Sequence, residues 1–174
     1  NDYTKLIFRP NASIYNNSRT ETGHFSTIEE VTTEKINDGQ SEYYSEGKGN
    51  DVGGRIDFSR KLGDDGRVIS AQLSGQSGTS ENNGSSVAET IYYRGTRPND
   101  IIDQRFTNQN ENNSWRGYIS YVEPLGKDNF IQLAYQYRQN ISVSDRDTRT
   151  EEVLGSGNYN VLDTLYSKRL DNNF

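Results

Sequence analysis

Apolar and polar residues alternate along residues 113–144. Successive side chains of a strand point to opposite faces, so alternation predicts strands with one apolar and one polar face. The second half places its apolar side chains on one parity: Ile131, Leu133, Tyr135, Tyr137, Ile141 and Val143. The first half alternates likewise around Trp115 and Ile119, and Pro124, Gly126 and Asn129 lie between the halves. Turn residues between two alternating runs predict an antiparallel hairpin.

The predicted hairpin has an expected register, with its turn centred near Gly126. The cross-strand pairs on the apolar face are then Tyr121–Ile131, Ile119–Leu133, Gly117–Tyr135 and Trp115–Tyr137. Apolar side chains directly opposite one another stabilise a sheet. We also expect the Tyr135 ring to lie over the bare backbone of Gly117, an arrangement called aromatic rescue.

Shorter alternating runs predict the remaining strands. We expect them at residues 3–16, 52–62, 67–76 and 161–174. Pro10 has no N–H for the ladder, which places it at an edge, a bulge or a strand start. Gly63–Gly66 predicts a tight turn, and Arg97–Asp100 is a second turn signal. Ile28, Val31 and Ile36 hint at short strand extensions, but the polar stretches 17–51, 77–112 and 145–160 are expected to be mostly loops.

Strand length and loop length together indicate a membrane barrel. The alternating run 130–144 exceeds the usual 5–6 residues of a soluble strand and meets the roughly 9–11 residues that a tilted strand needs to cross a bilayer. Tight turns at 63–66 and 124–129 would alternate with the three long loops, as in outer-membrane barrels, whose short turns are periplasmic and whose long loops are extracellular. The alternative is a long hairpin in a soluble β-sandwich.

Composition fits a barrel with a wet interior. Only 30% of the 174 residues are hydrophobic, 11% are aromatic and 12 are Tyr, with a mean hydropathy of −0.99. Such polarity normally warns of disorder. Here the apolar residues are concentrated in alternating runs. The fold class we predict is therefore all-β: an antiparallel meander of long strands, a segment of about five to six strands of a transmembrane β-barrel.

Several classes of function are disfavoured. The chain has no Cys and one His, so Cys-based metal sites, disulfides and imidazole clusters are not expected. A net charge of −6 argues against a nucleic-acid partner. No apolar run is long enough for a transmembrane helix. No signal peptide is recognisable and Met is absent, so the chain is expected to be a mature product or an excerpt, and we favour one partial domain over residues 1–174.

Two turns and their flanking strands resemble a known family. The residues are Tyr121, Glu123, Pro124, Leu125, Gly126 and Lys127, followed by the aromatic alternation of residues 130–137. The turn Arg60, Lys61, Leu62 and Gly63, followed by Gly66, Arg67 and Ser70, is similar to the preceding turn of the same barrels. Residues 162–174 resemble the next strand. Together they resemble TonB-dependent outer-membrane receptors, in the branch described as outer-membrane β-barrel family proteins.

The resemblance implies an architecture and partners. Such receptors enclose a plug in a barrel of about 22 strands, and this chain would supply five strands and the start of a sixth, without the plug or the C-terminal strand. The implied function is uptake of a nutrient across the outer membrane of a Gram-negative cell. The implied partners are outer-membrane lipid, the remainder of the barrel with its plug, the energy-coupling TonB protein acting through other regions, and a possible surface lipoprotein.

The polar parity of the strands is where we expect functional contacts. In a barrel it faces the lumen, where it meets a plug, meets a polar solute, or only solvates the interior. The lumen-facing candidates are Arg55, Asp57, Gln72, Arg116, Tyr118, Gln132, Gln136 and Arg138. Tyr and Trp on the apolar parity are expected at the membrane interfaces.

No enzyme, cofactor or metal site is predicted. The adjacent acids Glu29–Glu30 and Glu151–Glu152 are expected to be solvated loop charge, and His24 has no nucleophile near it in sequence. Segments such as Asp64–Gly66 lack the full calcium-loop series.

Two alternatives to the receptor remain open. One is a soluble extracellular β-domain with a glycan-binding or adhesive role, and the other is a barrel with no transport role. In the barrel interpretation, the excerpt alone in water is expected to aggregate or stay disordered, because its apolar face and strand edges lack partners.

Overall fold

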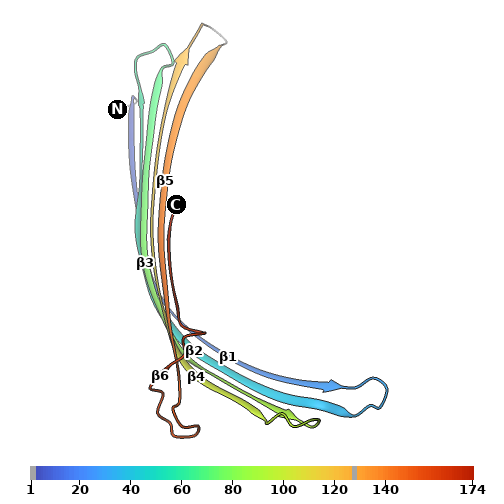
Figure 1. The fold of residues 1–174 in the computed structure, drawn as a ribbon. Coiled ribbons are helices and arrows are strands. Elements are labelled where there is room, and N and C mark those ends of the chain that lie inside the picture. The colour runs from blue at the N-terminus through green and yellow to red at the C-terminus, as the bar shows by residue number, and fades with distance from the viewer. Residues whose placement is uncertain (1–2, 127–128) are drawn as a thin grey trace.

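The computed structural model describes residues 3–126 and 129–174. Five long antiparallel strands form a meander: β1 (Thr4–Ile28), β2 (Lys35–Lys61), β3 (Val68–Tyr92), β4 (Asp100–Pro124) and β5 (Phe130–Thr150). The short strands β6 (Val161–Leu162) and β7 (Lys168–Asn173) both pair with β5. The described residues form one open sheet in the order β1-β2-β3-β4-β5, continued by β6 and β7 (Figure 1). The predicted all-β meander of long strands is confirmed.

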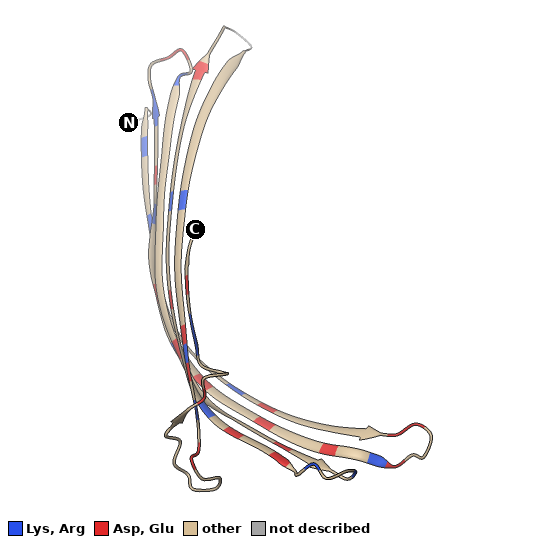
Figure 2. Cartoon of the chain, viewed as in Figure 1, with Lys and Arg blue, Asp and Glu red and all other residues tan. Residues whose placement is uncertain are grey.

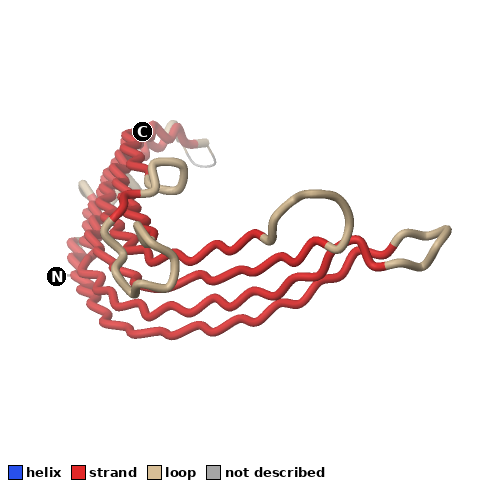
Figure 3. The backbone as a smooth tube through the Cα atoms, turned by 60° about the horizontal axis from the view of Figure 1, so that its bottom comes forward, coloured by secondary structure: helices blue, strands red, loops and turns tan. Residues whose placement is uncertain are grey.

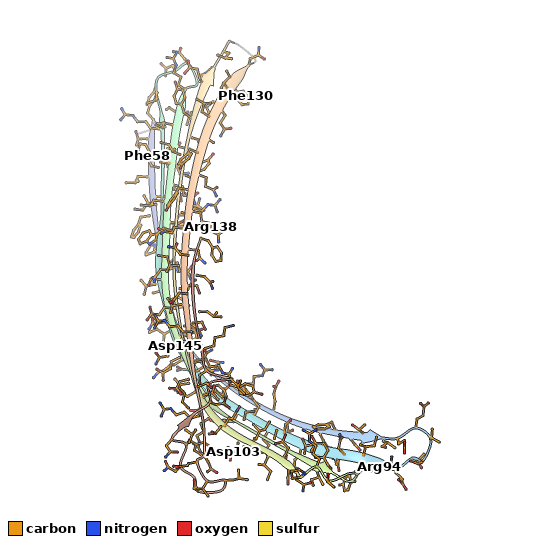
Figure 4. All side chains as sticks on the ribbon, in the orientation of Figure 1. Phe58, Arg94, Asp103, Phe130, Arg138 and Asp145 are labelled. Carbon is orange, nitrogen blue, oxygen red and sulfur yellow. The ribbon has the colours of Figure 1, made fainter. Side chains whose placement is uncertain are left out.

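The sheet bends sharply near the middle of its strands (Figure 1). The bend lies near Asp145 of β5, which is labelled in Figure 4, and the cross-strand row through Asp145 includes Lys48 and Glu81. We call the part with the Leu62–Arg67 turn the upper arm and the part beyond this row the lower arm. Gly47 and Gly49 lie beside the row, and Gly78 lies three residues from Glu81; glycine inside a strand often marks a tight bend.

In the upper arm the two faces of the sheet differ in polarity. The apolar face carries, row by row, pairs such as Leu6–Phe58, Ala71–Ile119 and Tyr121–Leu133. The polar face carries the intervening residues. Hydrophobic alternation put these residues on one face, as predicted, since a strand has a side-chain period of two. Figure 2 shows that charges are sparse in most of the upper arm and more frequent in the lower arm.

The sheet is a single layer without a hydrophobic core. Among the described residues, Phe106 is the only buried hydrophobic side chain. The buried polar side chains Ser45, Gln104 and Thr148 share its face, close to the bend. A soluble domain normally packs its apolar face against a second layer. No helix long and apolar enough to cross a membrane occurs in the described part of the chain.

The expected long loops are wrong in large part. Residues 17–28 and 35–51 extend β1 and β2, residues 77–92 and 100–112 extend β3 and β4, and residues 145–150 extend β5. The strands are therefore 21 to 27 residues long. Figure 3 shows loops confined to the ends of the hairpins and to the β5–β7 connection. In the lower arm both faces are mostly polar, so no alternation marks the strands, although backbone pairing is continuous through them.

The predicted contrast between tight turns at one end of the sheet and long loops at the other is also wrong. Residues 62–67 and 125–129 connect strands at one end of the sheet, and residues 29–34 and 93–99 do so at the other with similar lengths. Only the connection 151–160 is longer. The turn at Gly63–Gly66 is confirmed, since both glycines have positive φ, of 107° and 89°, and Leu62 N–H donates to the Arg67 carbonyl at 2.9 Å. The turn signal at Arg97–Asp100 falls at the connection between β3 and β4.

The register of the β4–β5 hairpin is shifted by two residues from the prediction. Tyr121 pairs with Leu133, Ile119 with Tyr135, Gly117 with Tyr137 and Trp115 with Gln139. Leu125 N–H donates to the Asn129 carbonyl at 2.8 Å, and the strand pairs are centred one residue later than Gly126. Lys127, part of the resemblance, lies outside the described residues. A shift of two preserves which face each side chain occupies, so the apolar face is unchanged.

The expected aromatic rescue at Gly117 is wrong. Nothing lies within 4 Å of the position that a Cβ at Gly117 would take. Pro10 lies in β1, opposite Gly54 and on the edge strand, as one predicted option required.

The last predicted strand, residues 161–174, is interrupted. β6 pairs with Arg149 and Thr150, whereas β7 pairs with residues 141–146 of the same strand. Residues 163–167 therefore bulge out of one sixth strand that runs along β5.

Candidate functional site

All eight predicted candidates lie on the polar face of the upper arm. Register places Arg55, Arg116 and Arg138 in one cross-strand row, with Arg9 opposite Arg55 and Ser74 between Arg55 and Arg116. The next row contains Asp57, Gln72, Tyr118 and Gln136. Gln132 pairs with Val122 two rows further along. Seven of the eight are therefore neighbours, and Gln132 stands apart.

Asp57 is shared by two arginines on the β1 side of this face. Arg9 Nη1 forms an ion pair with Asp57 Oδ2. Arg55 contacts the other oxygen, with Nη2 at 2.6 Å and Nε at 2.7 Å from Oδ1. The two guanidinium groups and the single carboxylate leave this group with one net positive charge. Arg9 is not among the candidates predicted from sequence, and only the strand register reveals its ion pair with Asp57.

Arg116 and Arg138 form a second group on the β4–β5 side. The two residues are directly opposite each other, and Arg116 Nη2 donates to Gln136 Oε1 at 2.9 Å. No ion pair with an acid is present for either arginine among the described residues. Figure 4 places Arg138 in the upper arm, together with Phe58 and Phe130. The polar face of the upper arm is therefore more cationic than the chain as a whole.

A cavity that the sequence did not predict lies in the lower arm. Its volume is about 780 Å³, and its lining includes Tyr44, Glu46, Arg105, Asp147 and Tyr159. Most lining side chains lie on the side of the lower arm that continues the apolar face of the upper arm. Part of the lining comes from residues 77–112, which were expected to be a loop. No signal in the sequence could have found it, because its strands have no alternating pattern.

The connection between β5 and β6 closes one side of this cavity. The Arg105 guanidinium lies 4.5 Å from the centre of the Tyr159 ring. The Tyr159 hydroxyl donates to Asp103 Oδ1 at 2.9 Å. Burial, and then this bond to a carboxylate, raise the pKa of Tyr159 above its ordinary value. The Tyr159 hydroxyl therefore keeps its proton, and its role as a donor to Asp103, to a higher pH than an ordinary tyrosine.

The predicted weak sites gain no chemistry from the structure. Glu151 accepts hydrogen bonds from the N–H groups of Gly155 and Gly157, which is loop structure. Glu29 pairs with Arg94, and His24 Nδ1 lies 3.6 Å from Asp38 Oδ1 on an exposed edge. In residues 3–126 and 129–174 no group of three or more His, Cys, Asp or Glu side chains could hold a metal ion.

Comparison with models of known protein families gives no match, and comparison with curated proteins gives none either.

Proposed function

We propose that this chain is a segment of an outer-membrane β-barrel receptor of the TonB-dependent type, which takes up a nutrient. One observation carries the proposal: the exposed apolar face is limited to one arm and is about one bilayer tall. In β1 the band runs from Leu6 to Ile14, in β4 from Trp115 to Tyr121, and in β5 from Ile131 to Val143, with Gln139 inside the β5 range. Beyond it the same face carries Lys48, Glu81 and Asp145.

The height of the band suits a membrane. About ten residues at ~3.3 Å each, tilted by ~45°, cover roughly 23 Å, close to the ~25 Å apolar band of outer-membrane barrels. Side chains in it are widely exposed, for example Leu6 at 68%, Leu133 at 66% and Tyr135 at 67%. An exposed apolar surface of this extent is rare on a soluble monomer, and hydrocarbon is the solvent it suits.

The open edges of the sheet support the same proposal. The outer edge of β1 pairs with no other described strand over its 25 residues. Such an edge exposes unpaired N–H and C=O groups, which a closed barrel removes. In this proposal lipid covers the apolar face, further strands continue the sheet, and the polar face lines the lumen. The upper-arm turns are periplasmic, and the lower arm extends outside the cell.

The experiment is to compare the 174-residue chain in buffer and in detergent or lipid by circular dichroism and sedimentation. We expect aggregation or disorder in buffer and β-structure with detergent or lipid. A monodisperse chain that unfolds cooperatively in buffer would overturn the proposal.

The second candidate is a soluble extracellular β-domain that binds glycans. The cavity of about 780 Å³ favours it, because tyrosines, acids and arginines in its lining suit a polyhydroxylated ligand. Cooperative folding of the chain in buffer would favour this second candidate.

A further inference from the structure

The two groups of arginines on the polar face differ in their charge balance. Arg9 and Arg55 share the carboxylate of Asp57. Arg116 and Arg138 share none: Arg116 donates to the neutral amide of Gln136, and no hydrogen bond or ion pair is present for the Arg138 side chain among the described residues. The second group is therefore a pair of adjacent cations without a counter-charge.

Such a pair is unfavourable unless something else neutralises it. Arg116 and Arg138 are directly opposite on neighbouring strands, where Cβ atoms are about 4.5–5.5 Å apart and like charges destabilise the sheet. Arginine cannot relieve the repulsion by losing its proton, because its pKa is too high. An anion placed between the two guanidinium groups would convert the repulsion into two charge-assisted interactions.

The surroundings favour an oxyanion. The guanidinium fork matches the geometry of a carboxylate or phosphate in a bidentate manner. Both arginines are exposed, so the anion has access. Tyr118 and Gln136 occupy the adjacent row and offer neutral donors and acceptors to the rest of a ligand.

The position of the pair points to a solute that enters from the lower-arm side. Trp115, next to Arg116 in sequence, is the last apolar residue of the β4 band on that side, since Asn113 follows on the same face. A solute arriving through the lower arm would meet the two arginines where the lumen enters the part of the barrel that spans the membrane.

We propose that Arg116 and Arg138 form a two-pronged binding site for an oxyanion, the carboxylate or phosphate group of a transported solute. This inference rests on the proposed function, because the polar face is a lumen only in a barrel. The hydrogen bond from Arg116 Nη2 to Gln136 Oε1 holds the Arg116 guanidinium toward the adjacent row.

The test uses the complete 174-residue chain in a non-ionic detergent, with inorganic phosphate as the probe. Phosphate binding is measured by calorimetry and by NMR shifts of the arginine Nε–H signals, with chloride at equal ionic strength as the comparison. The double variant R116Q/R138Q should bind phosphate at least about tenfold more weakly, since two charge-assisted interactions are lost. R116K/R138K keeps both charges but loses the forks, and should fall between the two.

R60Q is the matched control. Arg60 lies on the apolar face of β2, in the row of Ile69 and Tyr121, and the change removes one arginine charge from the other face of the same arm. We expect phosphate affinity in R60Q to equal that of the unchanged chain.

The outcomes separate this inference from the proposed function. Detergent-dependent β-structure without phosphate binding, or equal losses in R116Q/R138Q and R60Q, would overturn the oxyanion site alone. Failure of the chain to form β-structure in detergent would overturn the barrel proposal and this inference with it.

Discussion

At the scale of single residues, aromatic rings replace the missing side chains of four glycines. In each case the ring and the glycine are directly opposite on neighbouring strands. The pairs are Phe25–Gly39, Tyr15–Gly49, Trp115–Gly75 and Phe106–Gly84. A Cβ at any of these glycines would come within 3.0 Å of ring atoms. The same arrangement was expected at Gly117, where Tyr137 is the residue directly opposite and no ring atom lies within 4 Å of the Cβ position.

Gly84 gives the sharpest test of these contacts. A Cβ there would meet the Tyr44 carbonyl oxygen and the Phe106 ring, and the backbone atom cannot swing away as a side chain can. We expect Gly84→Ala to lower the free energy of unfolding in detergent by about 1–3 kcal/mol, the usual cost of overpacking.

Gly117→Ala is the control for this change, since its Cβ would meet nothing within 4 Å. Its effect should stay within about 0.5 kcal/mol. Urea unfolding followed by circular dichroism measures both variants. Equal destabilisation by the two would show that strand propensity, and not the ring contact, controls the effect.

At the scale of elements, a charged residue joins two connections at the tip of the lower arm. Arg94, between β3 and β4, contacts Glu29 Oε2 at 2.6 Å and Glu34 Oε2 at 2.5 Å, both between β1 and β2. Figure 4 labels Arg94 at this end of the sheet. The hydrogen bond from Thr32 and the interaction with Arg94 lower the pKa of Glu29 below its ordinary value.

This lowered pKa predicts a pH dependence with a definite sign. A carboxyl with a lower pKa in the folded state contributes stability above its unfolded pKa, and loses it as the pH falls through the folded pKa. We expect the Glu29 carboxyl to titrate below its ordinary 4.5, and Arg94→Gln to move its pKa upward. NMR titration of the side-chain carboxyl carbon measures both values. An unchanged Glu29 pKa in Arg94→Gln would mean that the hydrogen bond from Thr32, and not Arg94, lowers the pKa of Glu29.

The interrupted sixth strand depends on one serine. Ser167 Oγ accepts a hydrogen bond from Thr148 N–H at 2.9 Å and donates one to the Thr148 carbonyl at 3.2 Å. Thr148 is fully buried, at 0% exposure. The Ser167 hydroxyl therefore replaces the partner strand where the bulge of residues 163–167 interrupts pairing.

Ser167→Ala should leave the Thr148 amide without its partner. An unsatisfied buried donor costs about 1–3 kcal/mol, so amide exchange at Thr148 should accelerate by roughly tenfold or more. Ser18→Ala is the comparison, because Ser18 is exposed in β1 and has no side-chain hydrogen bond described. Thr148 protection that survives in Ser167→Ala would mean that the Tyr166 carbonyl and β6 suffice to close the bulge.

At the scale of the whole molecule, the two faces of the upper arm predict opposite responses to charge. Tyr135 lies on the apolar face, two residues from the middle of the β5 band, and Ala134 lies on the polar face; both are exposed in the same strand. If lipid covers the apolar face, Tyr135→Arg should destabilise the folded chain in lipid by about 2 kcal/mol, because an arginine on the lipid face costs most near the midplane.

Ala134→Arg, one residue away, should cost much less, because it would face the wet interior. Equilibrium unfolding from lipid vesicles measures the difference between the two variants. Similar costs at both positions would contradict a lipid-facing band and favour a sheet solvated on both sides.

The sequence by itself determined which residues share a face in the upper arm. Alternation fixes the face of Leu133 or Arg138 whatever the register, because a strand has a period of two and the observed shift of two keeps every side chain in place. The same pattern determined the all-β class, the turn at Gly63–Gly66 and the parity of the candidate site.

Only the tertiary structure decided the rest. The lower-arm strands are mostly polar on both faces, so pairing with neighbours, and no burial pattern, makes residues 17–28 and 77–92 strands. Register then selects which polar residues meet: it gives Asp57 to Arg9 and Arg55, and leaves Arg116 opposite Arg138. Pairing between strands depends on residues far apart in the chain, and no local pattern contains that information.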